Sequence, residues 1–360
     1  MPRQQRLQVR VHYPKNGGRI VLRTEENWER DLAPVSTSSN GACHEFVVYT
    51  PRPYLYFKPV LVDANRRRWA VGANCLAVGD STRPVDVYPK FDQDSRCSAC
   101  ERRELVDEQS GRRHAYRVFY PPGYDENTLQ RYPVLYMQDG QNLFFPDEAF
   151  QGEHWRVTET LGLLDDMNAI RPVIVVGIYP NEREIDYTRP GYHNYGRFVA
   201  ETLKPAIDAD YRTLSDPAST AVMGSSLGGV VSFYLAWQYP HVFGMAACLS
   251  STFGWRDDLS DRVAEESRRP CRFYLDSGWP EDNYEATRNM RNIMLRAGFR
   301  EGVDLHYLAF PEARHNERHW AIRTHIPFQL FFDEHRGGRQ RPASRQRSCE
   351  RVAYTEPVAA

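Results

Sequence analysis

The sequence predicts an α/β fold, a mostly parallel sheet with helices on both faces, preceded by a small β-sandwich. From about residue 114 onward, apolar strand-length runs alternate with helix-length segments, and such repeated β-then-α units form parallel sheets covered by helices. Residues from about 7 to 90 contain only short strand-like runs separated by turn residues, which is typical of a sandwich. The length of 360 residues favours about two domains.

The N-terminal residues 1–90 alternate polar and apolar side chains in several places. The alternation is clear in residues 7–13 and 19–23 and partial in 45–49, with Gly, Asn and Pro between these runs. We expect the aromatic residues of this region to form the core of a thin sandwich, with a sugar-binding face as the alternative. These aromatic residues are Trp28, Tyr49, Tyr54, Tyr56, Phe57, Trp69 and Tyr88.

Two segments lack a clear period. Residues 91–113 are charged and weakly periodic, so we expect a linker there, followed by one domain over residues 114–335. Residues 336–360 are rich in Arg, Gln, Ser and Gly and have few apolar side chains, which predicts a disordered tail.

Within residues 114–335, each element follows from its pattern. Residues 173–178 are apolar on both faces, which predicts a central strand of the sheet. Apolar runs predict the strands 115–120, 132–137, 173–178, 221–223, 243–249, 271–276 and 303–309, and helical spacing predicts the helices 155–168, 198–209, 230–239, 284–297 and 318–332.

Composition narrows the class of function. The formal net charge is −1, so no overall field favours nucleic acid as a partner. No apolar run approaches the roughly 20 residues that span a bilayer, and the first residues lack the apolar stretch of a signal peptide. We therefore expect a cytoplasmic protein that contacts neither nucleic acid nor membrane, with a homodimer as one candidate assembly.

The seven cysteines are odd in number and scattered, which does not suggest a disulfide framework. Cys97 and Cys100 form one Cys-x-x-Cys pair. A zinc site would need two further ligands, and Cys43 and Cys75 could supply them only if folding brings all four together. We expect reduced thiols and no metal or organic cofactor.

The residues around Ser226 form the strongest motif. Residues 224–229 read Gly-Ser-Ser-Leu-Gly-Gly, between an apolar run and a helix-length apolar run. This is the strand–turn–helix context of a nucleophile elbow, where small neighbours let the helix begin close to the strand. The helix N-terminus places backbone N–H groups and a positive dipole end beside the hydroxyl. Ser226 is the candidate nucleophile.

A serine nucleophile needs a base and an acid that orients it. With an elbow of this kind, the chain order is Ser, acid, His. His315 comes after the last predicted strand and directly before the last predicted helix, where the base belongs. His306 falls inside that strand, and His319 and His325 fall on the helix, where packing or surface roles suit them better.

The acid should lie in the loop after the strand 271–276. That loop offers three carboxylates, and we choose Asp282 as the acid. Asp276 is the alternative at the strand end, and Glu281 is the alternative beside Asp282. Asp282 precedes a predicted helix, so a simple N-cap role is also open.

An oxyanion hole needs two N–H donors aimed at the developing negative charge. We expect one donor to be the backbone N–H of Leu227, the residue after the nucleophile. The second is expected from the loop after the strand 132–137, where Gly140 lets the backbone approach a substrate, and we choose the N–H of Gln141.

Several stretches together resemble the esterase D, or "putative esterase", family of α/β-hydrolases, which includes enterochelin esterases and feruloyl esterases. The matching stretches are residues 120–124, 132–144, 175–178, 224–229 and 315–317 with Trp320. The resemblance implies Ser226 as nucleophile and His315 as base, and its spacing fits either Glu281 or Asp282 as acid. The family often has His where this chain has Gln138. The N-terminal region is similar to the immunoglobulin-like domain that precedes some members.

These residues predict a serine hydrolase that cleaves a carboxylic ester through an acyl-enzyme, with a small-molecule or glycan ester as substrate. An acyltransferase on the same three residues is the near alternative, because it differs only in whether an alcohol outcompetes water. The second alternative is a catalytically silent binding protein on a hydrolase fold.

Overall fold

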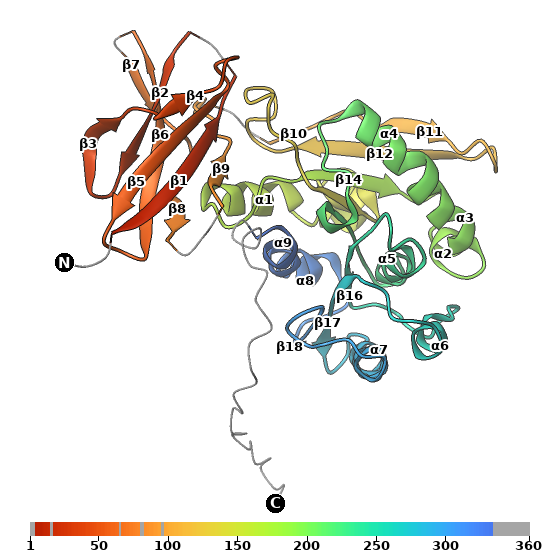
Figure 1. Cartoon of the computed structure of the whole chain (residues 1–360). Helices are drawn as coiled ribbons and strands as arrows, with labels where there is room; N and C mark the ends of the chain where they lie inside the picture. Colours follow the sequence, from red (N-terminus) through yellow and green to blue (C-terminus); the bar gives the residue numbers. More distant parts are fainter. Residues whose placement is uncertain (1–3, 15–16, 65, 80–82, 95–96, 334–360) are drawn as a thin grey trace, which may run out of the picture.

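The computed structural model describes residues 4–14, 17–64, 66–79, 83–94 and 97–333 (Figure 1). The N-terminal part holds two small sheets, and the rest of the described chain forms one large sheet with helices around it. The tail that the sequence predicts over 336–360 lies outside the described residues. None of the helices in the described part of the chain combines the length and the apolar character that crossing a bilayer requires.

The N-terminal part has one sheet in the order β4-β5-β1-β9 and another in the order β3-β2-β6-β7, with β8 also paired to β6. Its strands are β1 (Gln5–His12), β2 (Arg19–Thr24), β3 (Asn27–Leu32), β4 (Ser36–Thr37), β5 (Cys43–Thr50), β6 (Tyr54–Asp63), β7 (Arg66–Trp69), β8 (Cys75–Val78) and β9 (Val85–Val87). Both sheets contribute to one core, with Val9 and Phe46 from the first and Leu22 and Phe57 from the second.

The expectation that the N-terminal aromatic residues form the core is wrong for most of them. Phe57 is fully buried, but Tyr49, Tyr54, Tyr56 and Tyr88 are exposed. The reason is the period of two in a strand: in β6 the tyrosines alternate with the core residues, so they point to the opposite face.

Residues 91–113 are not a free linker throughout. They include β10 (Ser98–Ala99) and β11 (Arg103–Val106), and both strands pair antiparallel with β12 (Arg113–Tyr120). Charged side chains are common on edge strands because they discourage further pairing, so a charged run and a strand are compatible here. The domain boundaries at residues 90 and 113 stay predictions.

The large sheet has the order β10-β12-β14-β13-β15-β16-β17-β18, with β11 also paired to β12. The remaining strands are β13 (Val134–Met137), β14 (Ile174–Tyr179), β15 (Thr220–Ser225), β16 (Met245–Leu249), β17 (Arg272–Trp279) and β18 (Leu305–Pro311). The strands β13 to β18 run parallel to one another, and β12 is antiparallel to β14. A mixed sheet with helices is thus the observed class.

Helices cover both faces of this sheet. They are α1 (Val157–Asp166), α2 (Arg183–Tyr187), α3 (Gly191–Phe198), α4 (Lys204–Asp210), α5 (Leu227–Gln238), α6 (Leu259–Glu265), α7 (Tyr284–Arg296), α8 (Glu317–Ala321) and α9 (His325–Phe332). In β13, Val134 and Tyr136 pack into the core with α5, while Leu135 and Met137 pack into a second core with α1 and α9. Buried residues on both faces explain the continuous apolar run of this strand.

The predicted helix over 318–332 is in fact two helices. A turn at Ile322, Arg323 and Thr324 separates α8 from α9. Pro327 lies in the first turn of α9, where a missing backbone N–H costs nothing, but it could not continue a helix from α8 without loss of a hydrogen bond. This turn places Arg323 in the interior, with 2% of its surface exposed.

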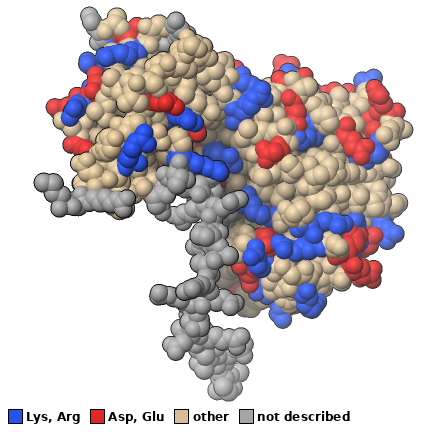
Figure 2. Space-filling model, in the orientation of Figure 1, with Lys and Arg blue, Asp and Glu red and all other residues tan. Residues whose placement is uncertain are grey.

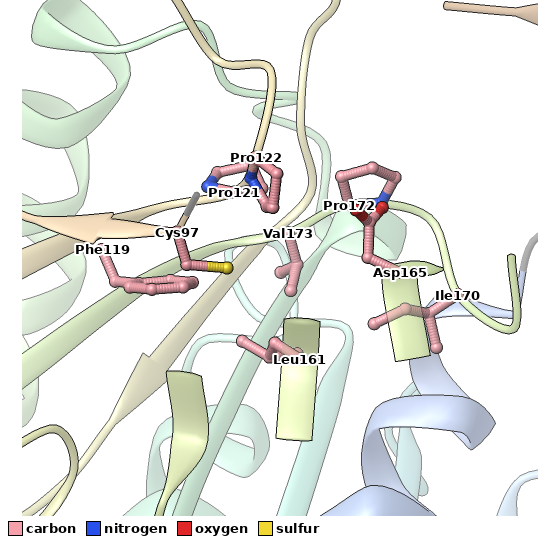
Figure 3. Close-up of a pocket in the computed structure, with 9 residues that line it drawn as sticks. All are labelled: Cys97, Phe119, Pro121, Pro122, Leu161, Asp165, Ile170, Pro172 and Val173. Carbon is pink, nitrogen blue, oxygen red and sulfur yellow. The ribbon is translucent and has the colours of Figure 1, made fainter. Parts of the chain in front are cut away.

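Buried polar contacts join the N-terminal part to the large sheet's surroundings. Lys90 pairs with Asp165 of α1. The amide of Asn127, which is fully buried, donates to the carbonyl oxygens of His12 at 2.9 Å and Pro89 at 3.0 Å. A small pocket lies next to Asp165, and Cys97, Phe119 and Leu161 are among the residues that line it (Figure 3).

The cysteines considered as zinc ligands lie on separate elements: Cys43 begins β5, Cys75 begins β8, and Cys97 lines the pocket of Figure 3. Burial raises the pKa of the Cys97 thiol to about 12, so this residue is a protonated thiol. Within the described residues, no group of three or more His, Cys, Asp or Glu side chains is placed to hold a metal ion.

Candidate active site

Ser226 lies at the sharp turn between β15 and α5, with φ 55° and ψ −122°. A positive φ is strained for a residue with a side chain, and such strain is maintained where the surroundings enforce it. Small neighbours make the turn sterically feasible. A Cβ atom on Gly224 would lie 2.4 Å from the carbonyl oxygen of Gly228, and one on Gly229 would lie 2.0 Å from Ser251 Oγ.

The structure brings Ser226, His315 and Asp282 together. His315 Nε2 lies 2.9 Å from Ser226 Oγ, and His315 Nδ1 lies 2.6 Å from Asp282 Oδ1. The three side chains follow β15, β18 and β17, whose parallel carboxyl ends meet at one edge of the sheet. The imidazole also packs edge-on against Trp320, with 4.9 Å between ring centroids.

Asp282 is fully buried and held from several sides. Its Oδ2 accepts hydrogen bonds from Ser250 Oγ at 2.5 Å and from the Gly278 N–H at 2.8 Å. Burial by itself raises the pKa of this carboxyl group. The hydrogen bonds from His315, Ser250 and Gly278 outweigh burial, so the pKa of Asp282 is lowered and the group is ionised at neutral pH.

The other two carboxylates of this loop have different surroundings. Asp276 is buried in β17, accepts a hydrogen bond from the Tyr274 hydroxyl at 2.7 Å and pairs with Arg323 at 3.3 Å. Burial raises the pKa of Asp276 to about 6, against the smaller opposing effects of Arg323 and Tyr274. Glu281 is exposed on the surface. Of these three carboxylates, Asp282 makes the hydrogen bond to His315.

The other candidate histidines have contacts away from Ser226. His306 belongs to β18. His319 on α8 accepts a hydrogen bond at Nδ1 from the Arg314 N–H at 3.1 Å, and His325 contacts the Ile322 carbonyl oxygen.

Both predicted oxyanion donors lie at the beginning of helical elements. Leu227 is the first residue of α5, and Gln141 lies in the 3₁₀ turn η1 (Gly140–Asn142) after β13. Among the residues that the structure describes, neither backbone N–H donates a hydrogen bond to a protein acceptor. Two free N–H groups at the carboxyl edge of the sheet can donate hydrogen bonds to a negatively charged oxygen.

An ion pair between Arg183 and Asp139, which the sequence analysis did not predict, holds the loop before Gln141. Arg183 donates from Nε and Nη2 to the two carboxylate oxygens of Asp139, at 2.8 and 2.9 Å. The N–H of Asp139 donates to the Tyr187 hydroxyl at 3.0 Å. A Cβ atom on Gly140 would lie 2.8 Å from the carbonyl carbon of Gly177, so this loop packs directly on β14.

Ser250 and Arg323 were also missed. Ser250 has φ 44° and follows β16, and Arg323 lies in the turn between α8 and α9. No local pattern marks either residue, because their position depends on the path of the chain around them. Gln138, where the family often has His, points inward and accepts a hydrogen bond from the Tyr195 hydroxyl.

Comparisons with known proteins agree with the sequence resemblance. The model of the Esterase family, which is described as "Putative esterase", matches residues 108–325. The uncharacterized protein YbbA of Bacillus subtilis is 24% identical over 201 residues, covering 53% of this chain and 78% of YbbA. An endo-1,4-beta-xylanase/feruloyl esterase of Xylanibacter ruminicola is 27% identical over 210 residues, covering 54% of this chain and 27% of that protein.

Solved structures share the fold at low identity. The enterobactin esterase FES from Shigella flexneri has a TM-score of 0.55 and 13% identity, and the match covers 91% of this chain and 93% of FES. The ferulic acid esterase AmCE1/Fae1A from Anaeromyces mucronatus has a TM-score of 0.54 and 18% identity, covering 68% of this chain and 94% of that one. The family match spans more than half of the chain, so this protein belongs to the Esterase family and is, by class, a carboxylic-ester hydrolase, as the sequence predicts.

Proposed function

We propose that this protein is a serine esterase in which Ser226 is the nucleophile, His315 the base and Asp282 the acid. The observation that carries the proposal is the hydrogen-bonded chain from Ser226 Oγ through both ring nitrogens of His315 to Asp282 Oδ1. A serine hydroxyl is a poor nucleophile until a base removes its proton, and this chain provides the base and the group that orients it.

The reaction proceeds in two halves. His315 accepts the proton of Ser226 as Oγ attacks the ester carbonyl carbon, and Asp282 stabilises the imidazolium that forms. His315 then gives that proton to the leaving alcohol, which yields the acyl-enzyme. In the second half, water gives a proton to His315 as its oxygen attacks the acyl carbonyl carbon. The bond between that carbon and Ser226 Oγ then breaks, and His315 returns the proton to Oγ, which releases the acid and restores Ser226.

The N–H groups of Leu227 and Gln141 bind the oxyanion in this proposal. Their support is that both lack an acceptor among the described residues and that Arg183 and Tyr187 hold Asp139, two residues before Gln141. Fixed donors are worth more to catalysis than mobile ones because they cost no reorganisation as charge develops.

We propose a small-molecule or glycan ester as substrate. One relative is named as a feruloyl esterase and another as a ferri-bacillibactin esterase, and these names support both small-molecule and glycan esters as candidate substrates. Initial rates on a panel of short acyl, feruloyl, thioester and siderophore esters would rank the acyl groups. Analysis of products with added alcohol would separate hydrolysis from acyl transfer.

We also propose that residues 1–90 form an immunoglobulin-like β-sandwich before a catalytic domain over residues 114–335. Two sheets with a common core, and a structural neighbour that extends over 91% of the chain, support this organisation. The cytoplasmic location and the homodimer stay predictions.

The test of the proposed function is Ser226→Ala, measured with p-nitrophenyl acetate and with a fluorophosphonate probe. We expect turnover to fall by about 1,000-fold or more and labelling to disappear, because the attacking oxygen is gone. Ser225→Ala is the matched control, since it removes the neighbouring hydroxyl and should leave both readouts near wild type. Unchanged turnover in Ser226→Ala would reject the proposal, and a wild-type protein that is never labelled would favour a silent binding protein.

A further inference from the structure

Asp282 is approached from two sides by one short stretch of chain. His315 precedes α8 and contacts Oδ1, while Arg323 follows α8 and lies with Nη1 3.6 Å from Oδ2. Ser250 connects the two charged groups. Its hydroxyl donates to Asp282 Oδ2 at 2.5 Å and accepts a hydrogen bond from Arg323 Nη2 at 2.8 Å.

Arg323 is itself held in place behind the site. Its Nη2 lies 3.3 Å from Asp276 Oδ1, and Tyr274 donates to the other oxygen of that carboxylate. The guanidinium also stacks over Phe310, 5.3 Å from the ring centroid. Burying a guanidinium is costly unless it is paired, so its two carboxylate neighbours are needed for it to remain there.

The charges of this cluster are matched to the proposed reaction. Asp276 and Asp282 are both fully buried, and two buried carboxylates this close to one another repel unless a cation lies between them. Arg323 occupies that position. With both acids ionised, the three groups have one net negative charge, which the imidazolium of His315 neutralises when it forms.

We propose that Arg323 is a positioning residue: through Ser250 and its own ion pairs it fixes the carboxylate of Asp282 so that Oδ1 faces His315. The inference rests on the proposed function, because the positioning matters only if His315 acts as the base. Ser250 and Asp276 share this positioning role, because they hold the guanidinium of Arg323 next to the carboxylate of Asp282.

Charged and titratable groups from several elements surround Asp282. The titratable and charged groups that face Asp282 are His315 before α8, Arg323 after α8, and Asp276 and Tyr274 of β17; the loop after β16 contributes the uncharged Ser250. Removing Arg323 together with Asp276 takes away one positive and one negative charge, so the expected effect on Asp282 is a loss of positioning rather than a change of net charge.

The experiment compares the double variant Arg323→Met with Asp276→Asn against wild type. Removing both charges avoids an unpaired buried ion. We expect kcat to fall by about 10- to 100-fold with KM within twofold, because substrate binding is unaffected while Asp282 is no longer fixed beside His315. The control is Arg197→Met with Asp107→Asn, which removes an ion pair with a nitrogen–oxygen distance of 3.0 Å. This pair lies away from the site, so kcat and KM should not change.

A double variant with wild-type kcat would overturn the inference. If that variant does not fold, Ser250→Ala is measured instead, with the same loss in kcat expected and wild-type kcat again overturning the inference. Ser226→Ala is assayed in parallel. An active Ser226→Ala means that the proposed function has failed, whereas an inactive Ser226→Ala beside a fully active double variant means that only the role of Arg323 has failed.

Discussion

Ser226 combines a strained backbone with a hydroxyl that already contacts an imidazole. Its φ of 55° is imposed by the strand and helix that it joins, and Gly224, Gly228 and Gly229 give the turn its room. The N–H of Ser226 donates to the Leu249 carbonyl oxygen at 2.9 Å, which ties the turn to β16. Strain of this kind persists because many neighbouring contacts enforce it.

Asp282→Asn is the sharpest single test of the acid. The amide keeps the shape of the side chain but loses the charge that stabilises the imidazolium, so we expect kcat to fall by about 1,000-fold or more. Steady-state kinetics with p-nitrophenyl acetate measure this. Glu281→Gln is the control, because Glu281 is exposed and should be dispensable. Equal losses in the two variants, or a loss only in Glu281→Gln, would contradict the choice of Asp282.

Asp276 gives a prediction for stability against pH. Burial raises its pKa from the ordinary value of 3.8 to about 6 in the folded protein, so the folded state binds more protons than the unfolded state between these values. Folding stability from this group is therefore greatest below about pH 4 and is lost as pH rises through about 6. Asp282 has the opposite effect on stability. Because its pKa is lowered in the folded state, it stabilises the fold at pH values above the ordinary pKa of 3.8, and this stability is lost as the pH falls through the lowered pKa.

Asp276→Asn should abolish the part of the pH dependence of folding stability that comes from Asp276. Relative to wild type, we expect the variant's free energy of unfolding to improve by on the order of 1–3 kcal/mol between pH 4.5 and pH 7, on top of any constant cost from Arg323. Urea unfolding of both proteins at the two pH values measures this difference. A variant whose difference from wild type is the same at both pH values would show that Asp276 does not titrate in this range.

The β15–α5 turn can be tested through its glycines. Gly224→Ala places a Cβ atom 2.4 Å from a backbone oxygen, which side-chain rotation cannot relieve, so we expect a loss of about 1–3 kcal/mol or more and loss of activity. Thermal unfolding and p-nitrophenyl acetate hydrolysis measure the two effects.

Gly162→Ala in α1 is the matched control. A Cβ atom there meets nothing closer than Cys97 Sγ at 3.9 Å, and Ala is favoured over Gly within a helix, so a gain of about 0.5–1 kcal/mol is expected. If both alanine variants had similar stability, the close packing of strand and helix at the turn would not be essential.

The turn between α8 and α9 shows how one short element serves two purposes. It ends the helix that carries Trp320 against His315, and it directs Arg323 inward. A continuous helix over 318–332 would project Arg323 according to the helical period alone. The break allows one segment to contact both oxygens of Asp282.

Charged side chains of both signs are interspersed over the face of the molecule that Figure 2 displays. The contacts between the N-terminal part and the rest include the buried amide of Asn127, the pair of Lys90 and Asp165, and an exposed hydrogen bond from Asn168 Nδ2 to the Ala73 carbonyl oxygen. Such buried polar groups make the relative position of the two parts specific, because each donor has its acceptor in only one arrangement.

Asn127→Ala tests this connection. It leaves the carbonyl oxygens of His12 and Pro89 without their donor, so we expect a loss of about 1–3 kcal/mol in the free energy of unfolding. Turnover should stay within twofold, because Asn127 is not in contact with Ser226, His315 or Asp282. Denaturant unfolding measures the loss, with the exposed Gln329→Ala as control. A loss no larger than in Gln329→Ala would show that the amide does not hold the parts together.

Much of the fold follows from local patterns. Apolar runs located the strands β12 to β18, and the helices α1, α5 and α7 lie close to their predicted bounds. Strand β10 was missed because it has only two residues, and β11 was missed because it is short and begins with Arg103 and Glu104; both pair only with β12. The exposure of Tyr54 and Tyr56 was missed because the pattern does not tell which face of β6 meets the other sheet.

By itself, the sequence determined the α/β class, the family and the position of Ser226, because a nucleophile elbow depends on glycines only a few residues away. It also predicted His315 as the candidate base, through its place between the last strand and the following helix. Only the tertiary structure decided that Asp282 rather than Asp276 or Glu281 reaches His315. It alone revealed Ser250 and Arg323 behind that carboxylate. The physical reason is distance along the chain: a turn is set by neighbouring residues, whereas hydrogen bonds between residues 33 and 73 positions apart depend on how the strands are ordered in the sheet.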